Sequence, residues 1–451
     1  MNTTANLGKA PVRTLVLQLA IPSMTAQFVN VLYSIIDRMY IGHISENGAL
    51  ALAGAGICGP IVTLLTSFGT LVGIGGSITM GIRMGEKNHK KAEQVLANSF
   101  LMLSIFSVLL TVSFLLLKDK LLMLFGASGA TFPFANTYLT IYTTGTFFAL
   151  MATGLNYFIN CQGFPLVGMF TVLIGAGCNI LSDPIFIFGF HMGIAGAAWA
   201  TVIGQIVSGI MVILYLRKFK TVDLTLKRLK PHPHYIGRIV SLGMAPFFNQ
   251  VSMMVVQIVM NNVLIRYGAK SSYGSDIPLA CAGIITKINM IFFSINIGIS
   301  QGLQPIISYN YGAKKLDRVR EAYLKAAISA TIISTVSFIC FQLFPRQIIG
   351  IFGSESEAYF RFAEKFFRIF LFCTFINGLQ PITANFFTAI GKANRGIFLS
   401  LTRQVIFLLP LMIILPIFFG IEGVMFSAPI ADGFAAICAI TFAVHELRSF
   451  H

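Results

Sequence analysis

The hydrophobic pattern is dominated by long stretches without a charged residue. No Asp, Glu, Lys or Arg occurs from Asn47 to Ile82, and none occurs from Leu121 to Ser182. Each stretch is longer than the roughly 20 residues that a helix needs to cross the hydrocarbon core of a bilayer. Apolar residues do not alternate with period two, so the pattern predicts membrane-spanning helices rather than a barrel.

Glycine, proline and charged residues divide the apolar sequence into twelve segments. We expect each segment to form one transmembrane helix, which makes the chain an all-α membrane protein. The predicted segments lie near residues 14–41, 49–82, 94–117, 134–159, 165–188, 192–216, 236–265, 279–308, 324–345, 362–390, 396–419 and 421–444.

The composition supports a membrane protein and excludes a nucleic-acid binder. Charged residues make up 11% of the chain and apolar residues 56%, whereas soluble domains carry about 25% charged residues. The net charge of +16 comes from Lys and Arg in every second loop, which is the positive-inside pattern rather than a nucleic-acid patch. None of the seven cysteines forms a C-x-x-C pair, so disulfide and transition-metal sites have little support.

The same charges predict the orientation of the chain. If the amino terminus and every second loop face the cytoplasm, twenty-one Lys and Arg lie on that side and nine on the other. Both termini are therefore expected inside the cell, and the first apolar run, which lacks a cleavage motif, is expected to stay as the first helix.

Short motifs recur at a nearly constant spacing, which indicates an internal repeat. The spacing is 227 residues for three glycine motifs and 228 for a fourth; the pairs are Gly56 with Gly283, Gly85 with Gly312, Gly193 with Gly420, and Gly163 with Gly391. Because each half has an even number of crossings, the halves are expected to be parallel repeats. We predict an amino-terminal lobe over 1–216, a cytoplasmic linker over 217–234 and a carboxyl-terminal lobe over 235–451.

A polar stripe on the first predicted helix ends in an acid. Gln27, Asn30, Ser34 and Asp37 are spaced by three, four and three residues, so they share one helical face. The seventh predicted helix repeats the stripe with amides, at Gln250, Gln257 and Asn261. We expect both stripes to line a substrate cavity between the lobes. The alternative is that Asp37 is solvated, or paired with Arg38, at the helix end.

A second acid lies in the fifth predicted helix. Asn179 precedes Asp183 by one turn on the same face, and Pro184 should distort the helix and free a backbone carbonyl. With Thr201 of the sixth helix and Asp37, these oxygens suit a hard cation such as Na⁺, or the acids could carry a proton instead. The alternative is an aspartate that caps a broken helix.

Three more charged residues lie inside predicted spans of the second half. Arg403 and Asp432 are on consecutive helices and are interpreted as a structural ion pair, because an unpaired buried charge is very costly; a second proton relay is the alternative. Lys287 has no obvious partner and could snorkel or pair with a cavity acid.

Five motifs give the chain a resemblance to a known family, and they span both halves. They are Asn179–Phe188, Gly193–Thr201, Gln301–Ala313, Arg403–Pro410 and Pro429–Asp432. With these motifs the chain resembles exporters of the multidrug and toxic compound extrusion (MATE) family, and its MepA-type bacterial branch in particular. The resemblance implies a V-shaped fold of twelve helices in two six-helix lobes.

The resemblance also implies a function. Such exporters expel organic cations and amphipathic drugs in exchange for inward-moving H⁺ or Na⁺, without an enzymatic cofactor. The family's coupling-cation site carries over onto Asp37, Asn179, Asp183 and Thr201. The acids that NorM-type relatives use on helices seven and ten are absent, and helix ten offers Asn377 and Gln380 instead.

The sequence therefore predicts a multidrug antiporter of the bacterial inner membrane that works by alternating access, with drug-like organic cations and the lipid bilayer as its partners. We expect a monomer, no nucleic acid and no enzymatic activity, since no H-E-x-x-H, G-x-S-x-G or P-loop motif occurs. The alternative function is a lipid-linked precursor flippase of the same superfamily, which would need a cationic cavity for a pyrophosphate.

Overall fold

The computed structural model describes residues 7–44, 47–218, 221–225, 229–274, 276–351 and 357–450. Parts of the predicted linker, at positions 219–220 and 226–228, lie outside these ranges. Within them the chain is helical, and no strand occurs in the described part.

The first half of the chain forms α2 (Val12–Gly42), α3 (Gly48–Gly85), α4 (His89–Leu124), α5 (Phe132–Thr144), α6 (Thr146–Cys161), α7 (Pro165–Pro184), the π-helix η1 (Ile185–Gly189) and α8 (Ile194–Arg217). The second half forms α9 (Pro233–Gly268), α10 (Asp276–Gly312), α11 (Leu316–Leu343), α12 (Pro345–Gly350), α13 (Glu357–Phe370), α14 (Thr374–Asn377), α15 (Leu379–Ala389), α16 (Ala393–Leu401), the π-helix η3 (Thr402–Leu408), α17 (Leu409–Phe419) and α18 (Ile421–Arg448).

Every predicted segment coincides with helix, but two of them are broken. By length and hydropathy, ten uninterrupted spans qualify among the described residues, and the pair α13 and α14–α15, bent by 45°, makes an eleventh. The predicted segment 134–159 is divided at Gly145 into α5 and α6, which have 13 and 16 residues and are each too short to span alone. The all-helical membrane fold is confirmed, while sequence reasoning missed both breaks.

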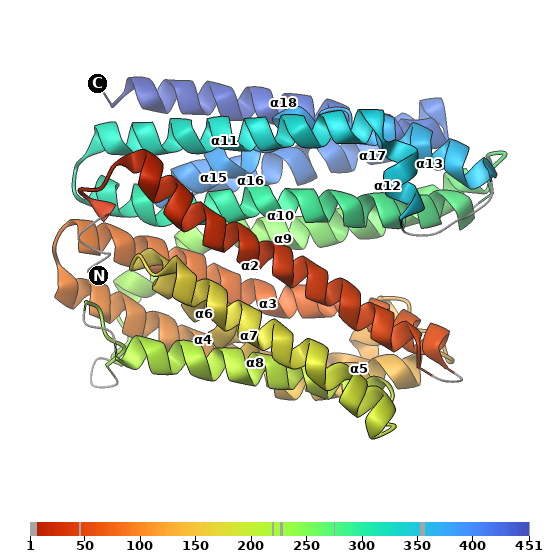
Figure 1. Cartoon of the computed structure of the whole chain (residues 1–451), viewed down its shortest axis with the longest axis horizontal. Helices are drawn as coiled ribbons and strands as arrows, with labels where there is room; N and C mark the ends of the chain where they lie inside the picture. The colour runs from red at the N-terminus through yellow and green to blue at the C-terminus, as the bar shows by residue number, and fades with distance from the viewer. Residues whose placement is uncertain are drawn as a thin grey trace.

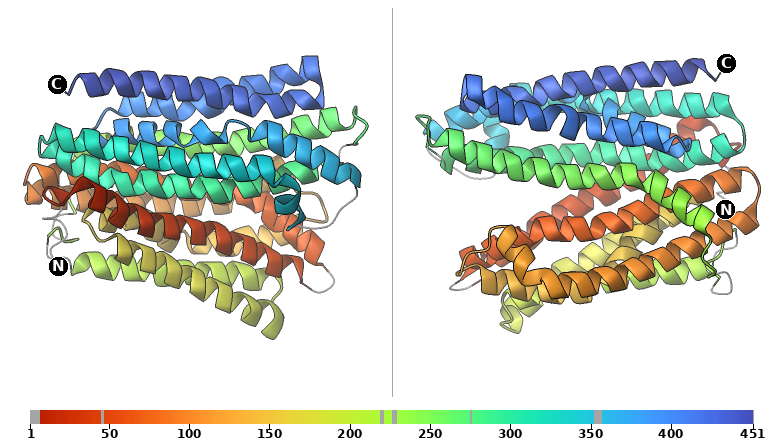
Figure 2. Two further views of the ribbon diagram at one scale, coloured as in Figure 1. Left: turned by 45° about the horizontal axis from the view of Figure 1, so that its top comes forward. Right: turned by 180° about the vertical axis from the view of Figure 1, so that it is seen from behind.

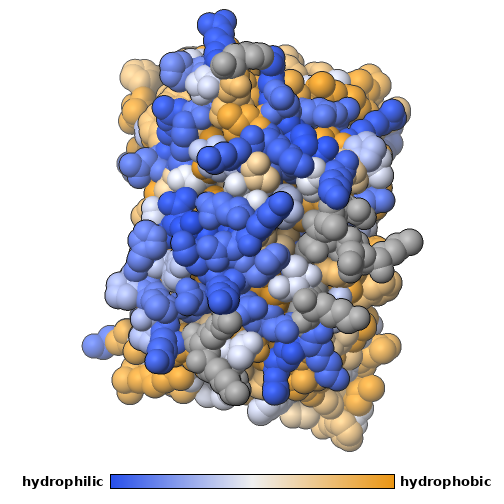
Figure 3. Space-filling model, turned by 90° about the vertical axis from the view of Figure 1, so that its left-hand side faces the viewer, coloured by the Kyte–Doolittle hydropathy of each residue, from blue (hydrophilic) through white to orange (hydrophobic). Residues whose placement is uncertain are grey.

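The helices form two groups, with α2 between them (Figure 1). The helices α3–α8 together with α2 make the first half, and α9–α18 make the second. Both termini lie at the same end of the molecule in every view (Figures 1 and 2). We call this end the terminal end; hydrophilic residues cover much of it (Figure 3). A cytoplasmic position for both termini agrees with this surface and remains a prediction.

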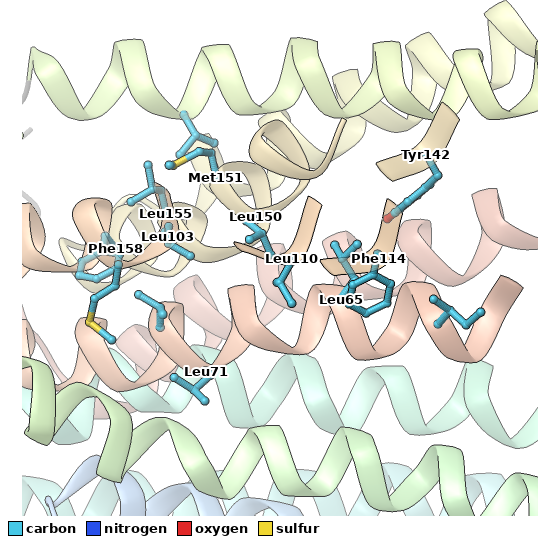
Figure 4. Close-up of a cluster of buried hydrophobic side chains, with 14 of the residues drawn as sticks. Leu65, Leu71, Leu103, Leu110, Phe114, Tyr142, Leu150, Met151, Leu155 and Phe158 are labelled. Atoms are coloured by element: carbon cyan, nitrogen blue, oxygen red, sulfur yellow. The ribbon is translucent and has the colours of Figure 1, made fainter. Parts of the chain in front are cut away.

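The buried core explains why the halves hold together. One cluster fills the first half and includes Leu65, Leu103, Leu150 and Phe158 (Figure 4). The first turns of α2 do not belong to it: Leu15 lies in a cluster with second-half residues of α10, α11 and α15. Conversely, Tyr235 and Ile239 of α9 pack in the cluster of the first half. At the terminal end, the first helix of each half thus packs against the other half. The predicted lobe boundaries at 216 and 235 remain predictions.

The contact between α3 and α10 lies on the pseudo-twofold axis. Gln304 Nε2 donates to Ser77 Oγ at 2.7 Å, and these residues are 227 positions apart. The Ser308 hydroxyl lies 2.3 Å from where a Cβ at Gly81 would stand, again at the repeat spacing. A residue that touches its own counterpart must lie on the axis that relates the halves. The contact geometry thus agrees with the repeat found in the sequence.

Around this axis the backbones of α3 and α10 approach too closely for side chains. A Cβ at Gly85 would lie 2.0 Å from the carbonyl oxygen of Tyr309, and one at Gly312 would lie 2.1 Å from that of Ile82. These two contacts are equivalent under the repeat, because Gly85 corresponds to Gly312 and Ile82 to Tyr309. We call the α3–α10 contact from Ser77 and Gln304 to Gly85 and Gly312 the terminal seal.

The terminal seal predicts a strong dependence on glycine. Gly85→Ala forces backbone apart, and overpacking of this kind costs about 1–3 kcal/mol. We expect a lower thermal unfolding temperature for the purified protein. Gly283→Ala is the matched control on α10, because nothing lies within 4 Å of its Cβ position; equal unfolding temperatures for the two variants would contradict the seal.

The ordered part of the linker predicts a pH effect. Val222 and Leu224 are buried against the first half, and between them burial and the nearby Glu93 raise the pKa of Asp223. A carboxyl whose pKa is raised by folding opposes the folded state once it ionises. Asp223→Asn should therefore raise the unfolding temperature at pH 7, and the gain should vanish as pH falls below the pKa of the unfolded chain. A gain that persists at pH 3 would argue against ionisation as the cause.

Candidate functional site

Two carboxyl groups from different helices meet inside the first half. Asp37 on α2 is 8% exposed and Asp183 on α7 is fully buried, and the two carboxyls are close enough to interact electrostatically. Helices α2 and α7 are direct neighbours. Two ionised carboxylates held near each other repel strongly, so the pair needs a proton or a cation between its members.

An amide and a hydroxyl extend this acid pair. Asn179 lies one turn before Asp183, and its Nδ2 donates to Thr201 Oγ1 on α8 at 3.2 Å. Thr201 in turn donates to the carbonyl of Ala197 at 3.1 Å. Helices α7 and α8 come this close because each has a glycine where they cross. A Cβ at Gly204 of α8 would lie 2.6 Å from the carbonyl oxygen of Gly175 of α7.

Pro184 breaks the hydrogen-bond ladder beside the acids. Proline has no N–H, so the carbonyl of Ile180 loses its donor. The chain continues as the π-helix η1, in which the Phe190 N–H donates to the carbonyl of Ile185 at 2.9 Å. The structure therefore has the helix distortion that the sequence predicted at this proline.

Four oxygens of the site are buried and accept no hydrogen bond within the described part of the chain. They are Asp37 Oδ1, both carboxylate oxygens of Asp183, and Asn179 Oδ1. Buried acceptors without donors are costly, and a set composed only of oxygens suits a hard cation or a proton. The donor chemistry thus fits Na⁺ as well as H⁺. No group of three or more His, Cys, Asp or Glu suited to a metal occurs among the described residues.

Sequence reasoning missed three tyrosines around the acids. Tyr33 lies one turn before Asp37 on α2, close enough to both acids to feel their charge. Tyr138 on α5 is close enough to Asp37 to feel its charge, and its ring stacks with that of Tyr142 at 6.3 Å between centroids. Tyr142 accepts a hydrogen bond from Gln205 at 2.9 Å. Tyr33 could have been identified from its i, i+4 spacing to Asp37, which places both on one helical face. Tyr138 and Tyr142 could not, because α5 contains no charged residue.

The site opens onto a cavity of about 430 Å³. Asn179 and Thr201 line it, together with Tyr33 and Tyr142. Most of its wall comes from the first half, and the second half contributes Gln250 of α9 and Ile297 and Gln301 of α10. Of the four predicted cation-site residues, Asn179 and Thr201 line the cavity, whereas Asp37 and Asp183 are not among its lining residues.

The predicted cavity residues fall into two groups. Gln27 and Asn30 line the cavity, whereas Ser34, Gln257 and Asn261 are not among its lining residues. Ser34 donates to the Val31 carbonyl of its own helix at 2.7 Å, and Gln257 donates to Asn261 at 3.0 Å. The role of these three in substrate binding remains a prediction.

The second half carries an ion pair in place of an acid pair. Arg403 Nε lies 2.5 Å from Asp432 Oδ1, and the Asp432 side chain is 3% exposed. Asn377 and Gln380 are also buried. Lys287 forms no ion pair in the described part of the chain, and the charged group acting on it is Arg38, which has the same sign.

Comparisons with known proteins agree with this arrangement. The MatE family model matches residues 22–185 and 247–414. The chain is 27% identical to the multidrug export protein MepA of Staphylococcus haemolyticus, over 95% of this chain and 92% of that protein. It is 25% identical to the protein of the same name from Staphylococcus aureus strain N315, over 98% of this chain and 95% of that protein.

Solved structures show the same fold. One is described as the outward-facing conformation of a multidrug resistance MATE family transporter of the MOP superfamily; its TM-score is 0.92 at 22% identity, over 100% of this chain and 99% of that one. A MOP superfamily transporter from Pyrococcus furiosus, whose description gives its binding pocket reversed polarity and suggests a different function, matches with the same score, identity and coverage. The fold is thus shared by transporters whose pockets differ, and the polarity of the cavity has to discriminate between functions.

The Arg403–Asp432 pair yields a stability prediction. Asp432→Ala leaves a buried guanidinium without its counter-charge, which costs about 3–5 kcal/mol. We expect a large fall in the thermal unfolding temperature. The double variant Arg403→Met with Asp432→Leu removes both charges, so its unfolding temperature should return most of the way to the wild-type value. If the double variant were no more stable than Asp432→Ala, the loss of stability could not be attributed to an uncompensated charge.

Proposed function

Because the chain belongs to the MatE family, we propose that it is a secondary active multidrug efflux antiporter. In this proposal it exports organic cations and amphipathic drugs and takes up H⁺ or Na⁺ in exchange, by alternating access. The proposal rests above all on the Asp37–Asp183 pair beside the cavity. The names of the staphylococcal relatives support multidrug export as the activity.

The acid pair supplies a physical reason for exchange. A cationic drug in the cavity is attracted by the negative charge of the pair, and a coupling cation neutralises that same charge. Since the two ligands compete for one charge, binding of the ion favours release of the drug. Asp37, Asn179, Asp183 and Thr201 would hold the ion, with Na⁺ ligated by the unpartnered oxygens of the first three and by the Thr201 hydroxyl, or with a proton held between the carboxyls.

The membrane potential supplies part of the driving force. An inward-moving cation gains about 2.3 kcal/mol per 100 mV, in addition to its concentration gradient. The transported ion must therefore reach the acid pair from the outside and leave toward the cytoplasm. With the termini in the cytoplasm, the terminal seal is the closed inner side of the cavity, and we interpret the structure as a state without a path to the cytoplasm.

The polarity of the cavity disfavours the flippase alternative. None of the residues that line it is Lys, Arg or His, while a pyrophosphate-bearing lipid needs cationic partners. Amide and hydroxyl side chains with an adjacent acid pair suit an organic cation instead. We propose that the protein is a monomer in the bacterial plasma membrane and that its two lobes rock to open the cavity to one side at a time.

Asp183→Asn tests the proposal directly. The amide keeps the shape of the side chain but carries no charge, so a cation can no longer change the charge of the site by binding there. We therefore expect gradient-driven drug transport in proteoliposomes to fall at least ten-fold. Wild-type protein measured under a pH gradient alone and under a sodium gradient alone identifies the coupling ion. Wild-type transport by a normally inserted Asp183→Asn protein would refute the assignment.

A further inference from the structure

A chain of hydrogen bonds crosses the cavity at its second-half wall. Gln27 Nε2 on α2 donates to Gln301 Oε1 on α10 at 2.9 Å, and Gln301 Nε2 donates to the hydroxyl of Tyr157 on α6 at 3.2 Å. Thr70 on α3 accepts a hydrogen bond from Gln250 Nε2 on α9 at 3.2 Å, and both Tyr157 and Thr70 line the cavity. We call these five residues the polar bridge; it joins the two halves at Gln301 and again at Gln250.

The polar bridge adjoins the terminal seal. One turn after Gln301, Gln304 is 2% exposed and reaches Ser77 on the pseudo-twofold axis. Between them, Gly302 is held against α2, because a Cβ there would lie 2.6 Å from Ala20 Cα. Gln301 lines the cavity and Gln304 does not. Along α10, Gln301 is therefore the last side chain that the cavity contents can reach before the seal.

The partner of Gln301 lies on the same helix as one acid of the pair. Gln27 and Asp37 are ten residues apart on one face of α2, about 15 Å along the helix. Pro22 precedes both and deprives α2 of one hydrogen bond, whereas Leu15 and Leu19, before Pro22, are fixed in the second-half core. The segment that carries Gln27 and Asp37 can thus shift while the start of α2 stays in place.

Charge at the acid site gives that shift a cause. Without a cation or a proton, the carboxylates on α2 and α7 repel each other; with one, they are drawn together. Because Gln27 is on this segment, a shift of the segment would change the distance between Gln27 and Gln301. A large enough shift would break the bridge at its junction with the second half.

We propose that Gln301 is a positioning residue that transmits ion occupancy of the Asp37–Asp183 site to the terminal seal. The inference rests on the proposed antiport function and deepens it. In the unloaded state the Gln27–Gln301 bond holds the seal closed, which prevents the empty transporter from turning inward. Loss of Gln301 therefore uncouples transport: drug still crosses down its own gradient, but the ion gradient no longer concentrates it.

The experiment uses full-length protein in proteoliposomes and measures two quantities for each variant. One is the accumulation of a fluorescent organic cation driven by the coupling-ion gradient. The other is the exchange of that cation across the membrane without an ion gradient. Gln301→Met keeps the length of the side chain and removes both hydrogen bonds, and Gln27→Met removes one of them from the opposite side.

Because both residues line the cavity, the quantity to compare is the ratio of accumulation to exchange, and we expect each variant to lower this ratio about five-fold, the factor that one buried hydrogen bond represents. The double variant should be no worse than either single variant, because both break the same bond. Gln301→Glu should restore accumulation, since its carboxylate accepts from Gln27 and from the Tyr157 hydroxyl. Gln342→Met is the matched control; this glutamine donates to the Arg368 carbonyl, away from the cavity.

The results separate the possible failures. Wild-type accumulation by Gln301→Met, or a loss of accumulation and exchange in equal proportion, overturns the role of Gln301. Additive losses in the double variant also overturn it. If wild-type protein itself shows no ion-driven accumulation, the antiport function fails first; if wild type accumulates the cation and Asp183→Asn does not, only the inference on Gln301 is at stake.

Discussion

The constraint on which the structure depends is the repulsion between two carboxylates held near each other and away from water. Asp37 and Asp183 come from helices that could each bury an aspartate separately at lower cost, yet α2 and α7 bring them together with unpartnered oxygens around them. Such an arrangement is stable only with a positive charge at hand. In the proposed antiport function that charge is either the coupling ion or a cationic substrate, and the rest of the molecule determines how the two occupants exclude each other.

Helix α2 has a position that suits this task. Its start is packed into the second half, its middle faces the cavity and its end carries Asp37 of the first half. A single helix thus touches the seal, the cavity and the ion site. The second half has no comparable acid pair, and its buried aspartate is neutralised by Arg403. The two halves share a fold, but only the first half has buried acids, Asp37 and Asp183, without a basic partner among the described residues.

Much of this could be predicted from the sequence. Hydropathy placed the helices, the glycine motifs gave the repeat, and the costly charges at Asp37 and Asp183 pointed to the residues that the structure brings together. The spacing from Asn179 to Asp183 predicted a shared helical face. Tyr138 and Gln301 could not be found in this way, because neutral polar residues carry little cost in a span and their importance depends on neighbours from distant parts of the chain. The breaks at Gly145 and after Phe370 were missed for a related reason. The hydropathy of a segment is an average over many residues, and this average does not change where the helix bends.

The pseudo-twofold axis at Ser77 and Gln304 has a consequence for how such a chain can diverge. In an assembly of two identical subunits, any residue on the axis would face a copy of itself, so serine would meet serine and glycine would meet glycine. Joining both copies in one polypeptide removes that restriction, and the pairs on the axis differ in residue type. The amide of Gln304 donates to the hydroxyl of Ser77, and the Ser308 side chain packs against Gly81, which has no side chain. Covalent fusion therefore permits a complementary fit at the centre of the molecule that symmetry alone would forbid.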